Sequence, residues 1–151
     1  MSWIKQVLDG STQQGATKPD FEITSEEIMR DMGALAHVSG VPTTEFAGDK
    51  NDLSAMVQCV AAEERNYWGQ AAGSRICAAP FYFERAAILF KKNKNALSEI
   101  SMCERWVAIA EDYKTQACVQ AGLFALVHKG PRSAAIYERL RKAKDKLNSK
   151  P

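Results

Sequence analysis

Three observations predict that this chain folds into an all-α domain of antiparallel helical hairpins, with about six helices. Apolar residues recur at helical spacing along most of its 151 residues. Helix start and stop signals, such as Pro80 and Gly130-Pro131, separate these stretches. No stretch shows the period-two alternation that is typical of a strand. A chain of this length buries about 70% of its unfolded surface, so it needs no metal or disulfide for a core.

The first 22 residues are predicted to form a short amphipathic segment followed by a flexible linker. Helical spacing joins the apolar residues Trp3, Ile4, Val7 and Leu8. Residues 9–22 contain two glycines, a proline and many small polar residues, which is a linker composition. The short segment either docks elsewhere on the fold or anchors a partner. Residues 23–151 are predicted to form a single helical domain.

The first helix of that domain is predicted to begin at Thr24. Thr24 and Glu27 have the spacing of a capping box, and Ile23 and Ile28 occupy the positions of the accompanying hydrophobic staple. The apolar stripe continues through Met32, Leu35 and Ala36. Gly40 followed by Pro42 is expected to end the helix.

The next three helices are predicted from their boundaries. Asn51 or Asp52 caps a second helix, which Gly69 or Gly73 ends. Pro80 suits the first position of a third helix, because it lacks the amide that would have no partner there. The turn Asn93-Lys94-Asn95 leads into a fourth helix, which has the strongest amphipathic pattern in the chain. Trp106 lies on its apolar stripe, so we expect it to be buried among the third, fourth and last helices.

The C-terminal part is predicted to contain a fifth and a sixth helix. The fifth runs from about Gln116 to Val127 and, being apolar all round, should be the most buried. Gly130-Pro131 ends it. The last helix extends from Arg132 to about Leu147 and is apolar on one side and basic on the rest.

A weak sequence match at a spacing of 34 residues relates the third and fourth predicted helices to the fifth and sixth. Glu104-Arg105 recurs as Glu138-Arg139, and three apolar identities accompany it: Ala87, Leu89 and Phe90 match Ala121, Leu123 and Phe124. Residues 80–148 thus resemble two tetratricopeptide-type helical hairpins. That resemblance implies a right-handed stack with a peptide-binding groove lined by the first helix of each pair. The family's Gly-Asp-Tyr turn is absent, so no individual binding residue carries over. An ordinary small helical bundle is the alternative.

Composition argues against a membrane or secreted protein. No apolar run approaches 18 residues, and the N-terminus reaches Asp9 too soon for a signal peptide. We therefore expect a cytoplasmic protein. No two of its four cysteines form a C-x-x-C pair, so we expect no metal site, and we expect no other cofactor. The four are instead expected to be small buried side chains: Cys59, Cys77, Cys103 and Cys118.

No motif in the chain predicts catalysis. A phosphate-binding loop, a nucleophile elbow and a histidine pair at i, i+4 are all missing from the sequence. The adjacent carboxylates Glu63-Glu64 project about 100° apart on a helix, so they cannot act on one substrate atom. The sequence therefore predicts a protein that is not an enzyme. The dipeptide Glu-Arg occurs four times, and two of these are expected to form buried ion pairs between helices.

Charge is unevenly placed along the chain, although the net charge is only +2. Residues 1–66 carry a net −6, residues 67–128 a net +2, and residues 129–151 a net +6. Either the two ends neutralise each other within one fold, or they form complementary surfaces. Phe81-Tyr82-Phe83 either contributes an exposed aromatic or packs as a corner against Tyr67 and Trp68. The predicted interaction surface comprises Tyr82, Phe83, Arg132, Arg139, Arg141, Lys142 and Lys144.

These features predict a protein–protein interaction or adaptor module of a bacterial-type cytoplasmic protein. A protein partner is expected, and an acidic one suits the basic last helix. Self-association between the acidic N-terminal half and the basic C-terminal helix is a related possibility. The alternative function is a small nucleic-acid-associated protein whose C-terminal helix lies along phosphates, although that helix lacks interleaved aromatics.

Overall fold

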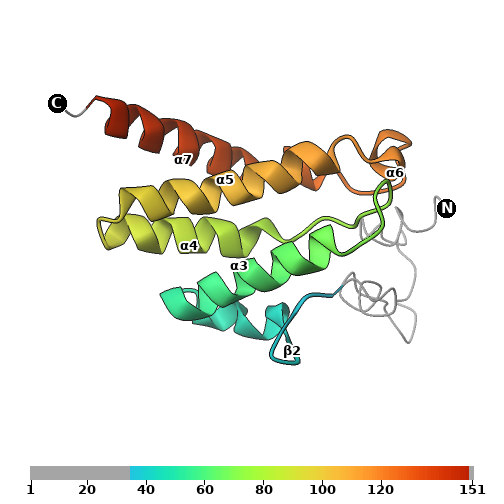
Figure 1. The fold of residues 1–151 in the computed structure, drawn as a ribbon, viewed down its shortest axis with the longest axis horizontal. Helices are drawn as coiled ribbons and strands as arrows, with labels where there is room; N and C mark the ends of the chain where they lie inside the picture. Colours follow the sequence, from blue (N-terminus) through green and yellow to red (C-terminus); the bar gives the residue numbers. More distant parts are fainter. Residues whose placement is uncertain (1–34, 150–151) are drawn as a thin grey trace, which may run out of the picture.

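In the computed structural model, which describes residues 35–149, the protein is a layered array of helices (Figure 1). α4 packs against both α3 and α5, and α7 covers α5 and α4 from the other side. Well over half of the described residues are helical, which confirms the all-α prediction. The helices are α3 (Leu53–Trp68), α4 (Pro80–Lys92), α5 (Ala96–Tyr113), α6 (Ala117–Gln120) and α7 (Pro131–Asn148), with the 3-10 segments η1 (Thr43–Asp49) and η2 (Val127–Lys129).

A two-stranded sheet stands where the sequence predicted the end of the first helix. β1 (His37–Val38) pairs antiparallel with β2 (Val41–Pro42). The turn between them has positive φ at Ser39 (48°) and Gly40 (82°), as a type I′ hairpin requires. Leu35 and Ala36 are not helical, so the predicted end of the first helix is wrong, whereas the all-α fold class stands because each strand has only two residues. The cause is the hairpin turn, whose positive φ angles no helix contains. The predicted helix start at Thr24 lies outside the described residues.

The starts of α3, α4 and α5 confirm the predicted boundaries. The Asp52 carboxylate accepts a hydrogen bond from the Ala55 amide (3.1 Å), and the Asn95 side chain accepts one from the Ser98 amide (3.1 Å). Each satisfies an amide that has no partner within the helix. Pro80 occupies the first turn of α4, where its missing N–H costs nothing.

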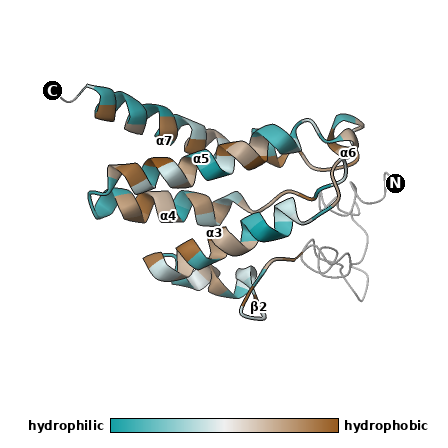
Figure 2. Ribbon diagram, in the orientation of Figure 1, coloured by the Kyte–Doolittle hydropathy of each residue, from teal (hydrophilic) through white to brown (hydrophobic). Residues whose placement is uncertain are grey.

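The core lies between α3, α4, α5 and the first half of α7, where the apolar faces of the helices meet (Figure 2). Trp106 is fully buried at its centre. Its indole Nε1 donates a hydrogen bond to Ser133 Oγ on α7 (2.9 Å), and its ring lies 5.4 Å from that of Phe83 on α4. The prediction that Trp106 is buried among these three helices is therefore confirmed.

The predicted fifth helix is wrong. Only one turn, α6, forms, because the chain reverses at Gly122 with a φ of +77°. Beyond this turn Phe124 is buried, whereas Leu126 is 51% exposed. The carbonyl of Ala125 accepts a hydrogen bond from the Tyr113 hydroxyl (2.7 Å), so a side chain replaces the partner that a helix would supply. Residues 121–124, which match residues 87–90 of α4 in sequence, thus lie outside any helix, so the two stretches do not share a structure.

Ion pairs between helices form at the Glu-Arg dipeptides, but they are not buried as predicted. Glu64 on α3 binds Arg105 on α5, with 2.9 Å between Arg105 Nε and Glu64 Oε2. Glu99 on α5 binds Arg139 on α7 at 3.0 Å. Both arginines are partly exposed, so these pairs lie at the rim of the helix interfaces rather than within the core.

Candidate protein-interaction groove

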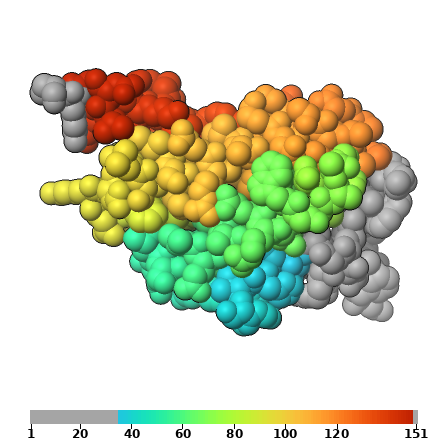
Figure 3. Space-filling model, in the orientation of Figure 1, coloured from blue at the N-terminus to red at the C-terminus, as the bar shows by residue number. Residues whose placement is uncertain are grey.

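A groove of about 610 Å³ lies between the α4–α5 turn, with the helix ends that flank it, and the stretch of α7 from Ala135 to Leu147. α7 diverges from α5 toward its C-terminus, and its last turns stand over the α4–α5 turn at one end of the molecule (Figures 1 and 3). The divergence leaves the facing sides of both elements uncovered. The lining residues are Lys91, Lys94, Asn95, Ala96, Glu99, Ala135, Glu138, Arg139, Lys142, Ala143, Lys146 and Leu147.

The lining of the groove has two parts, a set of basic side chains (the rim) and a set of small or apolar side chains (the floor). Five basic and two acidic side chains line it, a net of +3. The floor is formed by small or apolar side chains, namely Ala96, Ala135, Ala143 and Leu147. Alanines allow another chain to approach a helix closely, and Leu147, 38% exposed, has apolar surface still to bury.

The acidic side chains of the groove already have cationic partners. Glu99 is engaged by Arg139, and Glu138 by Arg141 at 2.6 Å and Lys142 at 3.8 Å. Within the described part of the chain, no ion pair is formed by Lys91, Lys94 or Lys146. The positive charge of the groove is therefore uncompensated at these three lysines.

The structure separates the basic residues that the sequence singled out. Arg139 and Lys142 line the groove. Arg132 instead lies against α4, where it binds Glu84 (2.8 Å) and stacks over the Phe81 ring at 5.0 Å.

The other two predicted basic residues lie on the exposed sides of α7. Arg141 binds Glu138 and Asp145 along its own helix, and Lys144 reaches Glu104 on α5 at 3.1 Å. Neither belongs to the groove lining. These ion pairs compensate both cations, so the two side chains offer a partner less charge than the groove lysines do.

The structure corrects the prediction that the two aromatic residues lie on the interaction surface. Tyr82 is 4% exposed and Phe83 is fully buried. The Tyr82 hydroxyl donates a hydrogen bond to the Thr43 carbonyl (2.7 Å) of η1. Neither ring is available to a partner in this fold, because both are buried. The sequence did not predict the contact between Tyr82 and η1.

Sequence reasoning missed the three uncompensated lysines as a site. Lys91 and Lys94 form a basic cluster with Lys92 around a predicted turn, and Lys146 lies on the predicted basic helix. Only the folding back of α7 toward that turn brings them to one groove. The local signal was the clustering of lysines at a hairpin turn, but their proximity depends on the angle between α5 and α7.

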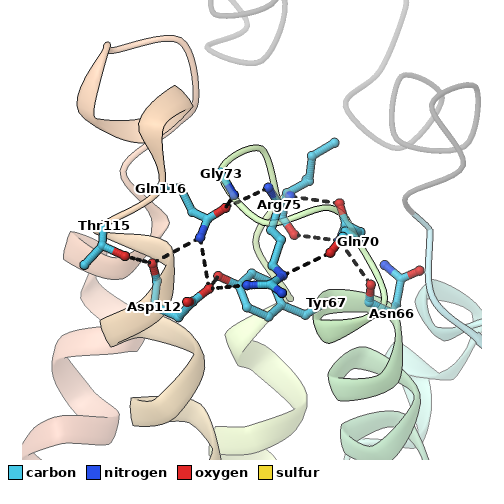
Figure 4. Close-up of polar contacts among 9 residues, drawn as sticks. Asn66, Tyr67, Gln70, Gly73, Arg75, Asp112, Thr115 and Gln116 are labelled. Carbon is cyan, nitrogen blue, oxygen red and sulfur yellow. Dashed lines mark hydrogen bonds and ion pairs between the residues drawn. The ribbon is translucent and has the colours of Figure 1, made fainter.

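A second polar cluster lies at the opposite end of α5 (Figure 4). Asp112 Oδ2 accepts hydrogen bonds from the Tyr67 hydroxyl (2.6 Å), Arg75 Nη1 (3.1 Å) and Gln116 Nε2 (3.1 Å). Gln116 Oε1 in turn accepts from the amides of Gly73 (2.7 Å) and Arg75 (3.0 Å). The cluster ties the α3–α4 connection to the end of α5.

The chemistry of this cluster is that of a structural contact. Burial, and then the bond to Asp112, raises the pKa of Tyr67 above its ordinary value. The phenol therefore stays protonated and continues to donate to the carboxylate. Arg75 also stacks over the Trp68 ring, 5.1 Å from its centroid. This stacking and the hydrogen bonds hold Arg75 in the loop.

Glu63 is a buried carboxylate on α3. Its oxygens accept hydrogen bonds from Thr43 Oγ1 (2.7 Å) and the Ala79 amide (2.9 Å), so it links η1 to the start of α4. Burial raises the pKa of Glu63, and these two hydrogen bonds oppose that shift.

The cysteines are reduced and mostly buried. Burial raises the pKa of Cys59 to about 11 and that of Cys103 to about 12, so both thiols are protonated near neutral pH. Such thiols are poor nucleophiles and poor metal ligands. Among the described residues, no group of three or more histidine, cysteine or acidic side chains is placed to hold a metal ion.

Comparisons with known proteins do not identify a relative. No family model, curated protein or solved structure matches the chain. In the part of the chain that the structure describes, no helix has both the length and the apolar composition to cross a bilayer.

Proposed function

We propose that this protein is a non-enzymatic interaction module whose groove binds an acidic, amphipathic segment of a protein partner. One observation carries the proposal: three lysines without ion pairs line the same groove as four small or apolar side chains, between two elements that diverge. A basic face alone is often only solvated. Here the apolar floor gives a partner surface to bury, and the lysines select the sign of its charge.

An amphipathic helix suits this groove better than an extended strand. The described part of the chain offers no long unpaired strand edge, because its one sheet consists of two strands of two residues each. A helix would lay its apolar stripe on Ala96, Ala143 and Leu147 and direct carboxylates toward the lysines at the rim.

A cytoplasmic setting forms part of the proposal. All four cysteines of the chain are free thiols, which is typical of proteins from a reducing compartment.

Charge reversal in the groove tests the function. The groove variant combines Lys91→Glu, Lys142→Glu and Lys146→Glu. The matched control combines Lys50→Glu, Lys92→Glu and Lys129→Glu, which changes the net charge equally at exposed lysines outside the groove. Both are compared with the wild type by affinity capture and mass spectrometry, and binding of a peptide from each captured protein is then measured by fluorescence anisotropy.

We expect the groove variant to bind an acidic partner peptide about tenfold or more weakly, because each reversal places like charges together. The control should bind as the wild type does. Equal binding by all three proteins would place the interaction elsewhere. Loss of a gel shift on RNA or duplex DNA in the groove variant, with steep salt dependence in the wild type, would instead indicate the nucleic-acid function.

A further inference from the structure

The sequence immediately before the described residues has a composition complementary to the groove. Residues 20–32 contain five acidic side chains and one basic side chain, a net of −4 over thirteen residues. Ile28 and Met32 are spaced to share one face of a helix, and Thr24 with Glu27 predicts a helix start. The same chain therefore carries both an acidic amphipathic segment and a basic groove with an apolar floor.

The magnitudes of the two charges suit a pairing. The groove lining has a net charge of +3, and its uncompensated cations are Lys91, Lys94 and Lys146. A predicted helix over residues 24–32 would be about 14 Å long, from a rise of about 1.5 Å per residue. It would place Glu26 and Glu27 near one end and Asp31 near the other. Carboxylates would thus be available along the length of a groove that spans several helical turns.

The position of Leu35 directs the segment toward another molecule. The described chain begins beside the C-terminal end of α3, whereas the groove lies at the other end of the array, where α5 begins and α7 ends (Figure 1). Leu35 and Ala36 are buried, and the Ala36 carbonyl accepts a hydrogen bond from the Thr43 amide (3.0 Å). These contacts fix the attachment point. The helix predicted over residues 24–32 ends three residues before Leu35 and has half the length of the 18-residue α5, which favours the groove of another molecule over that of its own chain.

We propose that residues 20–32 of one copy dock in the basic groove of a second copy. The proposal rests on the proposed function, since it uses the same groove, and it names this chain as an occupant. A reciprocal exchange about a two-fold axis fills both grooves and closes the assembly as a dimer. The uneven charge along the sequence then neutralises between copies, and Leu147 loses its exposure to solvent.

A charge-swap experiment tests this arrangement on the full chain. The groove variant is Lys142→Glu with Lys146→Glu, the segment variant is Glu26→Lys with Glu27→Lys, and a third protein combines all four changes. Lys92→Glu with Lys129→Glu is the matched control. Molar mass is measured by sedimentation velocity and light scattering from about 1 to about 100 µM, a range that covers micromolar dissociation constants.

We expect the wild type and the control to dimerise with rising concentration. The dimer dissociation constants of the groove and segment variants should each rise about tenfold or more. The variant with all four changes should recover dimerisation, because it restores opposite charges. A wild type that stays monomeric throughout this range overturns the proposal, as does a dimer that neither pair of changes weakens. A monomer whose groove still binds an acidic partner peptide would leave the proposed function standing and remove only the self-docking.

Discussion

α5 and α7 have the same length but are held in very different ways. Each contains 18 residues. α5 has eight buried residues, distributed from Glu99 to Tyr113, whereas α7 has only Ser133 and Ile136, both within its first two turns. The first half of α7 is therefore a core element, while its second half is a helix with an open face.

The second half of α7 is supported by its own charges rather than by burial. Arg141 bridges Glu138 and Asp145, which lie three positions before it and four after it. Pairs at these spacings stabilise an exposed helix modestly. One continuous helix thus combines a buried anchor with an exposed half, which is the part that the proposed function uses as a binding surface.

The largest effect should come from the centre of the anchor. Trp106→Ala removes a fully buried indole and leaves Ser133 Oγ without its donor. We expect the free energy of unfolding to fall by about 3–5 kcal/mol, because the surrounding helices cannot close the cavity. Urea denaturation followed by circular dichroism measures this loss. Trp106→Phe is the control, since it keeps a ring against Phe83 and should cost less. An alanine variant as stable as the wild type would contradict the assignment of this core.

The division of α7 can be tested with two truncations on the same helix. Ile136→Ala should cost about 2–4 kcal/mol, because Ile136 is fully buried in the anchoring half. Leu147→Ala should cost less than about 1 kcal/mol, because Leu147 keeps 38% of its surface exposed. Both are measured by chemical denaturation. Equal losses would show that α7 is packed along its whole length and that the groove is filled.

Sequence reasoning was accurate where a local rule decides the structure. The Asp52 cap and the first-turn Pro80 depend only on neighbouring backbone groups, so the sequence predicted them directly. The prediction of a helix after Gln116 failed because the apolar composition of this stretch fits a buried helix and a buried loop equally well. Gly122 decided between them, and a glycine within an apolar run does not by itself reveal a positive φ.

The candidate site was less accessible to prediction than the fold. The basic character of α7 was visible, but the groove also needs Lys91 and Lys94, some fifty residues earlier in the chain. Their meeting depends on an interhelix angle, which packing in the core sets. Tyr82 and Phe83 were misplaced for a related reason: both are buried by tertiary packing, and the sequence offered no signal for contacts such as that of Tyr82 with η1.

The comparison extends to carboxylates on the two sides of the array. Burial raises the pKa of Glu63 on α3, whereas the hydrogen bond from Arg141 lowers that of the exposed Glu138 on α7. A raised folded-state pKa means that stability from Glu63 is fully present below the unfolded pKa. It is lost as the pH rises through the folded pKa. Each unit by which the folded-state pKa exceeds the unfolded-state pKa corresponds to about 1.4 kcal/mol of stability.

Glu63→Gln should remove this pH dependence while preserving the contacts. The amide oxygen can accept from the Ala79 amide, and the amide nitrogen can donate to Thr43 Oγ1. We expect the variant to gain stability relative to the wild type as the pH rises from about 4 to about 8. Denaturation midpoints across this range measure the difference. A gap between the two proteins that does not change with pH would contradict the raised pKa.

The smallest effects should separate two arginines with similar partners. Arg105 on α5 and Arg141 on α7 each bind a glutamate through Nε and Nη2. Arg105 crosses to α3 and its side chain is 32% exposed, whereas Arg141 stays on its own helix at 58% exposure.

Arg105→Gln should therefore lower the free energy of unfolding by up to about 1 kcal/mol, because it unties α5 from α3 where solvent screens the pair only partly. Arg141→Gln should leave global unfolding unchanged within error. Its effect should appear only as faster amide hydrogen exchange in the last turns of α7, which open locally before the core does. Thermal melting and exchange mass spectrometry on the same samples distinguish the two cases. A drop in melting temperature for Arg141→Gln that matches the drop for Arg105→Gln would show that the second half of α7 unfolds with the core. The division of α7 into an anchor and a binding surface would then fail.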